Sequence, residues 1–210
     1  DIFLIISICS IMVENFKIGL FGFGCVGEGL FHVLENTNGI KTKIVKIAIK
    51  DKTKQRTLDK SFFTFDKYDI LDNPEINVVI ELIDDAEEAY SIVSYALSKG
   101  KHVITANKKM VATHLEELIS LEKNSNATLL YEASTCGSIP IIRTIAEYFG
   151  SEHIDNIAGI FNGTTNYILT KTILEGISYE EALLQAQEKG FAETDPTSDV
   201  EGFDPKYKSI

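Results

Sequence analysis

The feature that most constrains this chain is a glycine-rich turn between a short apolar run and an amphipathic segment. The apolar residues 18–21 lead directly into the turn GFGCVG, residues 22–27, and a helical pattern follows. A strand, a G-x-G-x-x-G turn and a helix in this order are typical of a dinucleotide-binding unit. We expect Gly22 to form the tight turn, Gly24 to let the backbone approach a pyrophosphate, and Gly27 to bring the helix close to the strand. Free N–H groups at the helix start would bind the phosphates, so the predicted cofactor contacts are Gly22, Phe23, Gly24, Cys25, Val26 and Gly27.

Strand-like and helix-like segments then alternate through the first part of the chain. We expect strands at 18–21, 43–49, 77–82, 101–105 and 128–131, and helices at 25–35, 86–97 and 111–123. This alternation predicts a parallel sheet with helices on both faces. Ligands of such sheets bind outside the carboxyl ends of the strands. We therefore expect one edge of the sheet to carry the segments 22–27, 84–85, 106–108 and 132–134.

After Pro140 the pattern changes, and we place a domain boundary near residue 134. Helices are expected at 139–149, from the NGTTN stretch at 162–166 to residue 175, and from a capping box at Ser178 and Glu181 to residue 190. Residues 154–161 are expected to form a strand. The loop that follows the last of these helices, 193–204, is dense in carboxylates.

Charge and cysteine content argue against several classes of protein. The 210 residues carry a formal net charge of -11, so the chain offers no basic face for nucleic acid. The three cysteines have no paired spacing and the four histidines have no ligand spacing, which argues against a disulfide framework and a zinc site. This cysteine usage is that of a reducing compartment, and we expect a cytoplasmic protein.

The first twelve residues, DIFLIISICSIM, differ in character from the rest. The run is apolar but too short to span a bilayer, and it lacks the basic region and the cleavage site of a signal peptide. We therefore expect no membrane association. We interpret residues 1–12 as a non-native or disordered extension ahead of a domain that starts near residue 13.

The residues after the second expected strand bear on the choice of cofactor. An NAD-binding unit usually places an acid there to bind the ribose hydroxyls, whereas a basic residue would pair with the 2′-phosphate of NADP. The chain has Lys50, Asp51 and Lys52 there, followed by Lys54 and Arg56. We predict NADP rather than NAD, with Lys50 as a cofactor contact, while Asp51 keeps NAD open.

Two segments carry residues suited to catalysis. Lys108 follows a strand on the predicted cofactor edge, where an amine can contact the cofactor or donate to a substrate oxygen. The segment from Ala186 to Lys208 presents carboxylates that can bind an amino group and a lysine that can protonate a carbonyl. Position alone also fits a surface lysine at a helix start and an acidic, solvated loop.

At this second segment the chain resembles a known family. The pattern A-x3-G-F-A-x2-D-P-x2-D-V-x-G-x-D-x3-K, from Ala186 to Lys208, is similar to the characteristic motif of homoserine dehydrogenases, and every fixed position is met. Three further stretches agree with that family: the glycine turn, residues 105–109 (TANKK) and residues 159–168 (GIFNGTTNYI). The resemblance covers residues 13–208. The family continues beyond them, so we interpret the chain as a C-terminally truncated fragment.

The resemblance implies an activity and a set of site residues. The activity is NAD(P)-dependent interconversion of L-aspartate 4-semialdehyde and L-homoserine, in threonine and methionine biosynthesis, by a homodimer acting on a small-molecule substrate. Lys208 would be the acid–base residue, and Lys108 a second catalytic lysine near the cofactor. The residues implied in substrate binding are Glu193, Asp199 and Asp204. A sodium ion is also implied, bound by main-chain oxygens of Glu132, Thr135, Gly137 and Ile139.

With this resemblance the predicted fold class is α/β. We expect a Rossmann-type doubly wound parallel sheet in residues 13–134, which binds NAD(P). An incomplete α+β domain in residues 135–210 would serve substrate binding, catalysis and dimerisation.

The chain departs from the family pattern at two places. It has Asp84 and Asp85 where the family usually has two glycines after the third strand, and Cys136 and Ser138 replace glycines after Glu132. Two alternatives therefore stay open. One is another Rossmann-type semialdehyde or amino-acid oxidoreductase, and the other is a catalytically impaired dinucleotide-binding fragment.

Overall fold

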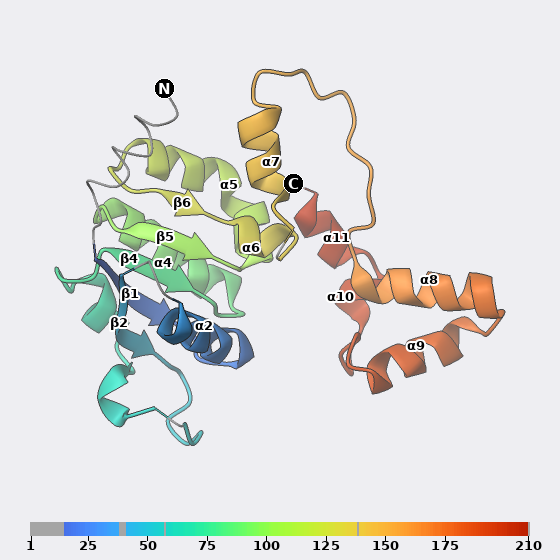
Figure 1. Cartoon of the computed structure of the whole chain (residues 1–210), viewed down its shortest axis with the longest axis horizontal. Helices are drawn as coiled ribbons and strands as arrows, with labels where there is room; N and C mark the ends of the chain where they lie inside the picture. Colours follow the sequence, from blue (N-terminus) through green and yellow to red (C-terminus); the bar gives the residue numbers. More distant parts are fainter. Residues whose placement is uncertain (1–14, 38–40, 57, 138, 210) are drawn as a thin grey trace. The chain divides into compact units, whose positions relative to one another are not determined.

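The structure is a computed structural model, which describes residues 15–37, 41–56, 58–137 and 139–209 (Figure 1). The extension predicted at residues 1–12 lies outside the described residues. The chain divides into two compact units between Tyr131 and Glu132. In the part of the chain that the structure describes, the first unit is built on a sheet and the second consists of helices and irregular segments.

A six-stranded parallel sheet forms the centre of the first unit (Figure 1). Its strand order is β3-β2-β1-β4-β5-β6, and every neighbouring pair is parallel. The chain reverses its direction of travel across the sheet between β1 and β4, which is the switch point at which such sheets bind ligands. The predicted doubly wound α/β fold is confirmed. The strands are β1 (Phe16–Phe21), β2 (Thr42–Ala48), β3 (Phe63–Thr64), β4 (Val78–Glu81), β5 (His102–Thr105) and β6 (Leu129–Leu130).

Helices cover both faces of this sheet. Successive residues of a strand point to opposite faces, and the first three residues of β4, Val78, Val79 and Ile80, are apolar on both. Val79 belongs to one core cluster together with residues of α4 (Ala86–Ser98) and α5 (Lys108–Lys123). Val78 and Ile80 belong to a second cluster, against which α2 (Cys25–Asn36) packs. A strand that is buried on both sides reads as a continuous apolar run, which is how β4 appears in the sequence.

The sequence pattern does not predict the outermost strand, β3. This strand follows a short 3-10 helix, η1 (Lys60–Phe62), and pairs with β2 only through Phe63 and Thr64. Two residues are too few to show the alternation by which a strand is recognised. The short helix α3 (Tyr68–Leu71) follows and packs next to β1 and β2.

The second unit carries two packed helices, α8 and α9, which form a helical hairpin (Figure 1). Their predicted starts are confirmed: the side chain of Asn162 accepts from the N–H of Thr165, and that of Ser178 accepts from the N–H of Glu181. Gly176 ends α8 in a left-handed conformation, with φ of 69°. The helices of this unit are α6 (Glu132–Thr135), α7 (Ile141–Tyr148), α8 (Gly163–Glu175), α9 (Tyr179–Glu188), α10 (Thr197–Val200) and α11 (Phe203–Lys208).

The strand predicted at 154–161 is wrong. This segment has no regular secondary structure, and residues 154–160 are exposed. Its isoleucines, Ile154, Ile157 and Ile160, recur every three residues, whereas one face of a strand needs a period of two. A strand is stabilised by hydrogen bonds from a neighbour, and among the described residues no strand pairs with this segment.

Gly19 on β1 provides a test of the packing of α3 against the sheet. A Cβ at Gly19 would lie 2.3 Å from Cγ2 of Ile70 and 3.2 Å from Cδ1 of Ile76. We expect Gly19→Ala to lower the free energy of unfolding by about 1–3 kcal/mol, because overpacking forces side chains or backbone to shift. Gly29→Ala on α2 is the control, since a Cβ there meets no atom within 4 Å and alanine favours a helix. Urea unfolding measures both variants, and a Gly19→Ala protein as stable as the parent would contradict this packing.

Candidate functional site

The turn between β1 and α2 contains three glycines, and two of them are required by close packing. Gly22 has a φ of 93°, which a side chain rarely adopts, and a Cβ there would lie 2.7 Å from the carbonyl oxygen of Leu82. A Cβ at Gly27 would lie 2.5 Å from the carbonyl oxygen of Gly22. A Cβ at Gly24, in contrast, would meet no atom within 4 Å. Gly22 thus lets the turn pack against the loop after β4, and Gly27 lets α2 pack against the turn. Gly24 leaves open space at the start of the helix.

The start of α2 fits a phosphate group. No side chain caps the helix at Gly24, and Cys25 and Val26 are exposed beside it. An uncapped helix N-terminus presents main-chain N–H groups and a positive dipole end, which together bind phosphate. Phe23 differs from its neighbours, because its ring is buried against two other phenylalanine rings and only its main chain is left for a ligand. These residues therefore fit the pyrophosphate of a dinucleotide.

The loop after β2 is held together by Asp51. Its Oδ1 accepts from the hydroxyl and the N–H of Thr53, each at 2.7 Å, and from the N–H of Lys54 at 3.3 Å. The Thr53 hydroxyl and then its N–H are the main causes that lower the pKa of the Asp51 carboxyl. Arg56 folds back and donates to the main-chain oxygens of Asp51 and Lys54 at 2.9 and 2.8 Å. Asp51 thus stabilises the loop itself, while Lys50 next to it is exposed.

Of the two acids after β4, Asp85 has a structural role. Asp84 and Asp85 are both exposed. Oδ1 of Asp85 accepts from the N–H groups of Glu87 and Glu88, at 3.1 and 3.0 Å. Asp85 is therefore the N-cap of α4, which gives this departure from the family pattern a structural reason.

Lys108 is the first residue of α5 and is half-buried. The residue before it, Asn107, is buried and connects two segments at the carboxyl edge of the sheet. Its Oδ1 accepts from the N–H of Met110 at 2.9 Å, and its Nδ2 donates to the carbonyl oxygen of Ile83 at 3.0 Å. The position of Lys108 is thus set both by the helix start and by the loop after β4.

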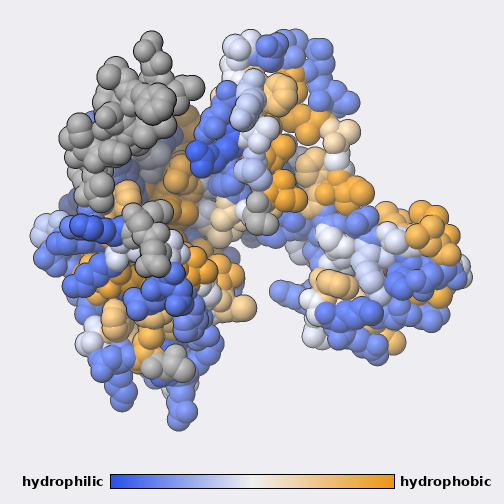
Figure 2. Space-filling model, in the orientation of Figure 1, coloured by the Kyte–Doolittle hydropathy of each residue, from blue (hydrophilic) through white to orange (hydrophobic). Residues whose placement is uncertain are grey.

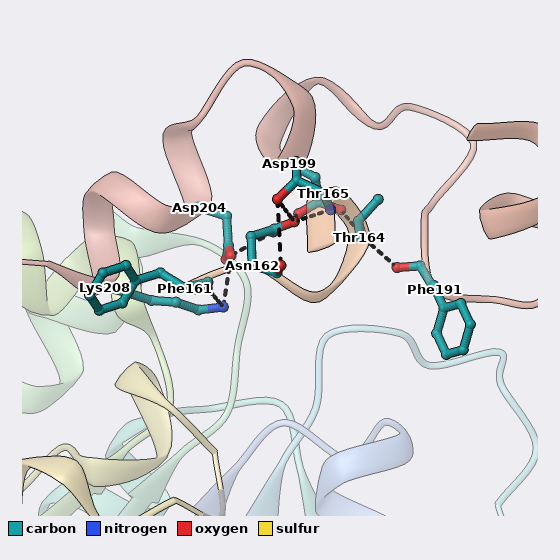
Figure 3. A network of polar contacts seen from close by, with 8 residues as sticks. All are labelled: Phe161, Asn162, Thr164, Thr165, Phe191, Asp199, Asp204 and Lys208. Carbon is teal, nitrogen blue, oxygen red and sulfur yellow. Dashed lines mark hydrogen bonds and ion pairs between the residues drawn. The ribbon is translucent and has the colours of Figure 1, made fainter. Parts of the chain in front are cut away.

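In the second unit a polar network holds Lys208 at the end of α11 (Figure 3). Its Nζ donates to Oδ2 of Asp204 at 2.7 Å and to the main-chain oxygen of Phe161 at 3.0 Å. Asp204 lies one turn earlier on the same helix and is 3% exposed. The paired ammonium offsets the cost of burying this carboxylate. The two hydrogen bonds use two of the three N–H groups of the ammonium, which leaves one that can donate to a substrate oxygen.

Asn162 joins Asp204 to a second acid, Asp199 (Figure 3). Its Nδ2 donates to Oδ2 of Asp204 at 2.9 Å and to Oδ1 of Asp199 at 2.8 Å. The hydroxyl of Thr164 donates to the other oxygen of Asp199 at 2.8 Å. The structure thus brings together three of the predicted site residues, Lys208, Asp204 and Asp199, through an asparagine that sequence reasoning assigned only to the start of a helix. The signal that could have found it is the polar stretch NGTTN within the segment that resembles the family.

Glu193 and the predicted sodium ligands lie in other surroundings. Glu193 is exposed, and it accepts from Nε2 of Gln187 through its main-chain oxygen at 3.0 Å rather than through its carboxylate. The carboxylate of Glu132 accepts from the N–H groups of Ile142 and Arg143, each at 2.9 Å, and so caps α7. Among the described residues no group of three or more His, Cys, Asp or Glu side chains could hold a metal ion. Nor does the described part of the chain contain a helix long and apolar enough to cross a membrane.

These features define the class of protein. The first unit is a dinucleotide-binding α/β domain, and the second is a helical unit with a lysine held by one buried carboxylate. Residues 22–132 match the family model for the NAD-binding domain of homoserine dehydrogenase, and residues 140–210 match the model for homoserine dehydrogenase. The chain belongs to the homoserine dehydrogenase family, which is a family of oxidoreductases.

Individual relatives agree with this family. The homoserine dehydrogenase of Bacillus subtilis is 42% identical over 205 residues, which cover 93% of this chain and 47% of that protein. The crystal structure of a homoserine dehydrogenase from Thiobacillus denitrificans is similar with a TM-score of 0.84 and 36% identity, over 93% of this chain and 47% of that chain. A hyperthermophilic archaeal homoserine dehydrogenase in complex with NADPH is similar with a TM-score of 0.81 and 27% identity. The match covers 93% of this chain and 68% of that chain. The chain thus spans about half the length of the curated relatives it matches.

Asn162 allows a test of the polar network. Asn162→Ala removes the cap of α8 and the shared donor of two carboxylates, so we expect the free energy of unfolding to fall by about 2–4 kcal/mol. Amide hydrogen exchange should become faster in residues 163–175, because the helix start is then unsatisfied. Asn166→Ala is the matched control, since Asn166 is exposed on the same helix. Similar exchange in the two variants would show that the network does not stabilise α8.

Proposed function

We propose that this chain supplies the nicotinamide-binding and catalytic segments of a homoserine dehydrogenase. The reaction interconverts L-aspartate 4-semialdehyde and L-homoserine in threonine and methionine biosynthesis. The observation that carries the proposal is the network in the second unit, in which Lys208 is bound to the buried Asp204. It is supported by the glycine turn of the first unit, which fits a dinucleotide.

Lys208 acts as the catalytic acid and base in this proposal. Reduction of an aldehyde adds a hydride to the carbonyl carbon and a proton to the oxygen. The nicotinamide cofactor supplies the hydride when it is bound. Lys208 Nζ donates the proton to the aldehyde oxygen, and in the oxidation direction the neutral amine takes it back. Asp204 holds this ammonium in place through its ion pair, at 2.7 Å.

The other site residues follow the same proposal. Asp199 and Glu193 bind the ammonium group of the amino-acid substrate, and Lys108 assists at the cofactor edge of the first unit. The polar contacts of Asp199 support its part, since Asn162 and Thr164 fix the orientation of its carboxylate. We also propose a sodium ion on the main-chain oxygens of Glu132, Thr135, Gly137 and Ile139. Gly137 has a φ of 60°, a left-handed conformation that favours glycine.

We propose NADP as the preferred cofactor. The acid that could bind the ribose hydroxyls of NAD, Asp51, is engaged by Thr53 and Lys54 within its own loop. Lys50 is exposed next to it and can pair with a 2′-phosphate.

A homodimer in the cytoplasm completes the proposal. The support for a dimer is apolar surface on α8, where Leu169, Ile173 and Leu174 are exposed (Figure 2). A second copy of the protein would cover such side chains. The support for the location is the cysteine usage of the chain.

The catalytic part of the proposal is tested by replacing Lys208. Lys208→Ala should lower kcat for reduction of L-aspartate 4-semialdehyde by about 10²- to 10⁴-fold, because the proton donor is lost, and leave NADPH binding unchanged. Lys206→Ala is the control, since Lys206 is exposed on the same helix. Oxidation of NADPH would be followed for this chain and for the longest natural form that contains it. NADPH binding without turnover in both forms would favour a catalytically impaired dinucleotide-binding protein instead.

The cofactor preference is tested at Lys50. Lys50→Glu should weaken NADPH binding by about 10-fold and change NADH binding little, since only NADPH carries the 2′-phosphate. Lys43→Glu is the control, because Lys43 is exposed near the other end of the same strand. Titration calorimetry with both cofactors gives the dissociation constants. Equal weakening for NADH and NADPH would contradict a 2′-phosphate contact.

A further inference from the structure

A closed ring of buried polar contacts lies at the carboxyl ends of β4 and β5, outside the residues that the proposed reaction uses. Its members are Glu81, Thr105, Asn107 and the main chain of Ile83. Glu81 and Thr105 are both 0% exposed. A carboxyl group at such a depth costs stability unless its oxygens are hydrogen-bonded.

The ring begins with two bonds to the Glu81 carboxylate. Oε1 accepts from the N–H of Ile83 at 2.6 Å, and Oε2 accepts from the hydroxyl of Thr105 at 2.5 Å. Burial is the main cause that raises the pKa of Glu81, and these two donors oppose it. Glu81 thus binds its own loop, after β4, to the end of the next strand.

Asn107 closes the ring. Its N–H donates to the hydroxyl oxygen of Thr105 at 3.1 Å, and its Nδ2 donates to the carbonyl oxygen of Ile83 at 3.0 Å. Both main-chain polar groups of Ile83 are therefore bound, the N–H by Glu81 and the oxygen by Asn107. Lys108, the first residue of α5, follows Asn107 directly, so this helix starts next to the ring.

The same loop is in contact with the glycine turn. The N–H of Leu82 donates to the carbonyl oxygen of Phe21 at 2.9 Å. A Cβ at Gly22 would lie 2.7 Å from the carbonyl oxygen of Leu82 and 3.4 Å from Cγ2 of Ile83. A shift of residues 82–83 would therefore change the space available to the turn that precedes α2.

We propose that Glu81 is a positioning residue, which through Ile83 and Thr105 fixes both the glycine turn that binds the dinucleotide and the start of α5 that carries Lys108. This inference rests on the proposed function, which gives the turn its role in binding the dinucleotide and Lys108 its role at the cofactor edge. An apolar residue in place of Glu81 would fit the core of the sheet, but it could not accept from Ile83 and Thr105. The buried carboxylate thus lowers the stability of the fold, but its hydrogen bonds give the cofactor edge a defined shape.

The test compares Glu81→Leu and Thr105→Val with Lys101→Met. Lys101 is also a buried charged residue between β4 and β5, but it lies at the opposite end of β5, where Nζ donates to the main-chain oxygens of Asn73 and Ile76, each at 2.6 Å. All three variants should be less stable. The two ring variants should in addition raise the dissociation constant of NADPH by about 10-fold and speed amide exchange at 82–85 and 108–110, whereas Lys101→Met should change neither.

For Glu81→Gln, we expect a dissociation constant of NADPH and amide exchange rates between those of the parent and of Glu81→Leu. The amide oxygen of this variant can still accept from the N–H of Ile83. Thr105→Val keeps the test valid if Glu81→Leu does not fold. Ring variants that bind NADPH as tightly as Lys101→Met, with the same exchange at 82–85, would reduce Glu81 to a structural role and overturn the proposal. Both readouts are independent of turnover, so an inactive parent protein would refute the proposed reaction without deciding this inference.

Discussion

The cofactor edge of this protein depends on the close approach of the Gly22 main chain to the carbonyl oxygen of Leu82. β1 and β4 are neighbours at the switch point of the sheet, so the turn after one and the loop after the other leave the sheet side by side. There is room for both only because Gly22 has no Cβ, and room for α2 only because Gly27 has none. Other apolar residues could build the same strands, whereas this turn requires glycine.

The second unit relies on a different kind of interaction. Its network joins buried and half-buried polar groups, and its charged members are bound by others: Lys208 by Asp204, and Asp204 and Asp199 by one amide of Asn162. Asn162 also caps α8, so a single side chain stabilises a helix and orients two acids. A network of this kind is rigid when it is complete and costly when one member is lost.

Some elements of this fold follow from local sequence patterns and others do not. The strand β4 and the caps at Asn162 and Ser178 follow from local patterns, and the structure has them where they are predicted. β3 was missed because two paired residues leave no period. The strand expected at 154–161 is wrong, because its isoleucines recur every three residues and, among the described residues, no strand pairs with it. At the site, Lys208, Asp204 and Asp199 were named from a motif, but the donor that joins them was not.

The sequence by itself determined what is local: the hydrophobic periods, the glycine turn, the helix caps and the family to which the chain belongs. These depend on residues within a few positions of each other, so a single pass along the chain can detect them. Only the tertiary structure decided which buried groups share a partner. Asn162 and Asp204 are 42 residues apart, and Glu81 and Thr105 are 24 apart. No local pattern records such pairs, because they form only when the sheet and the helices have brought distant segments into contact.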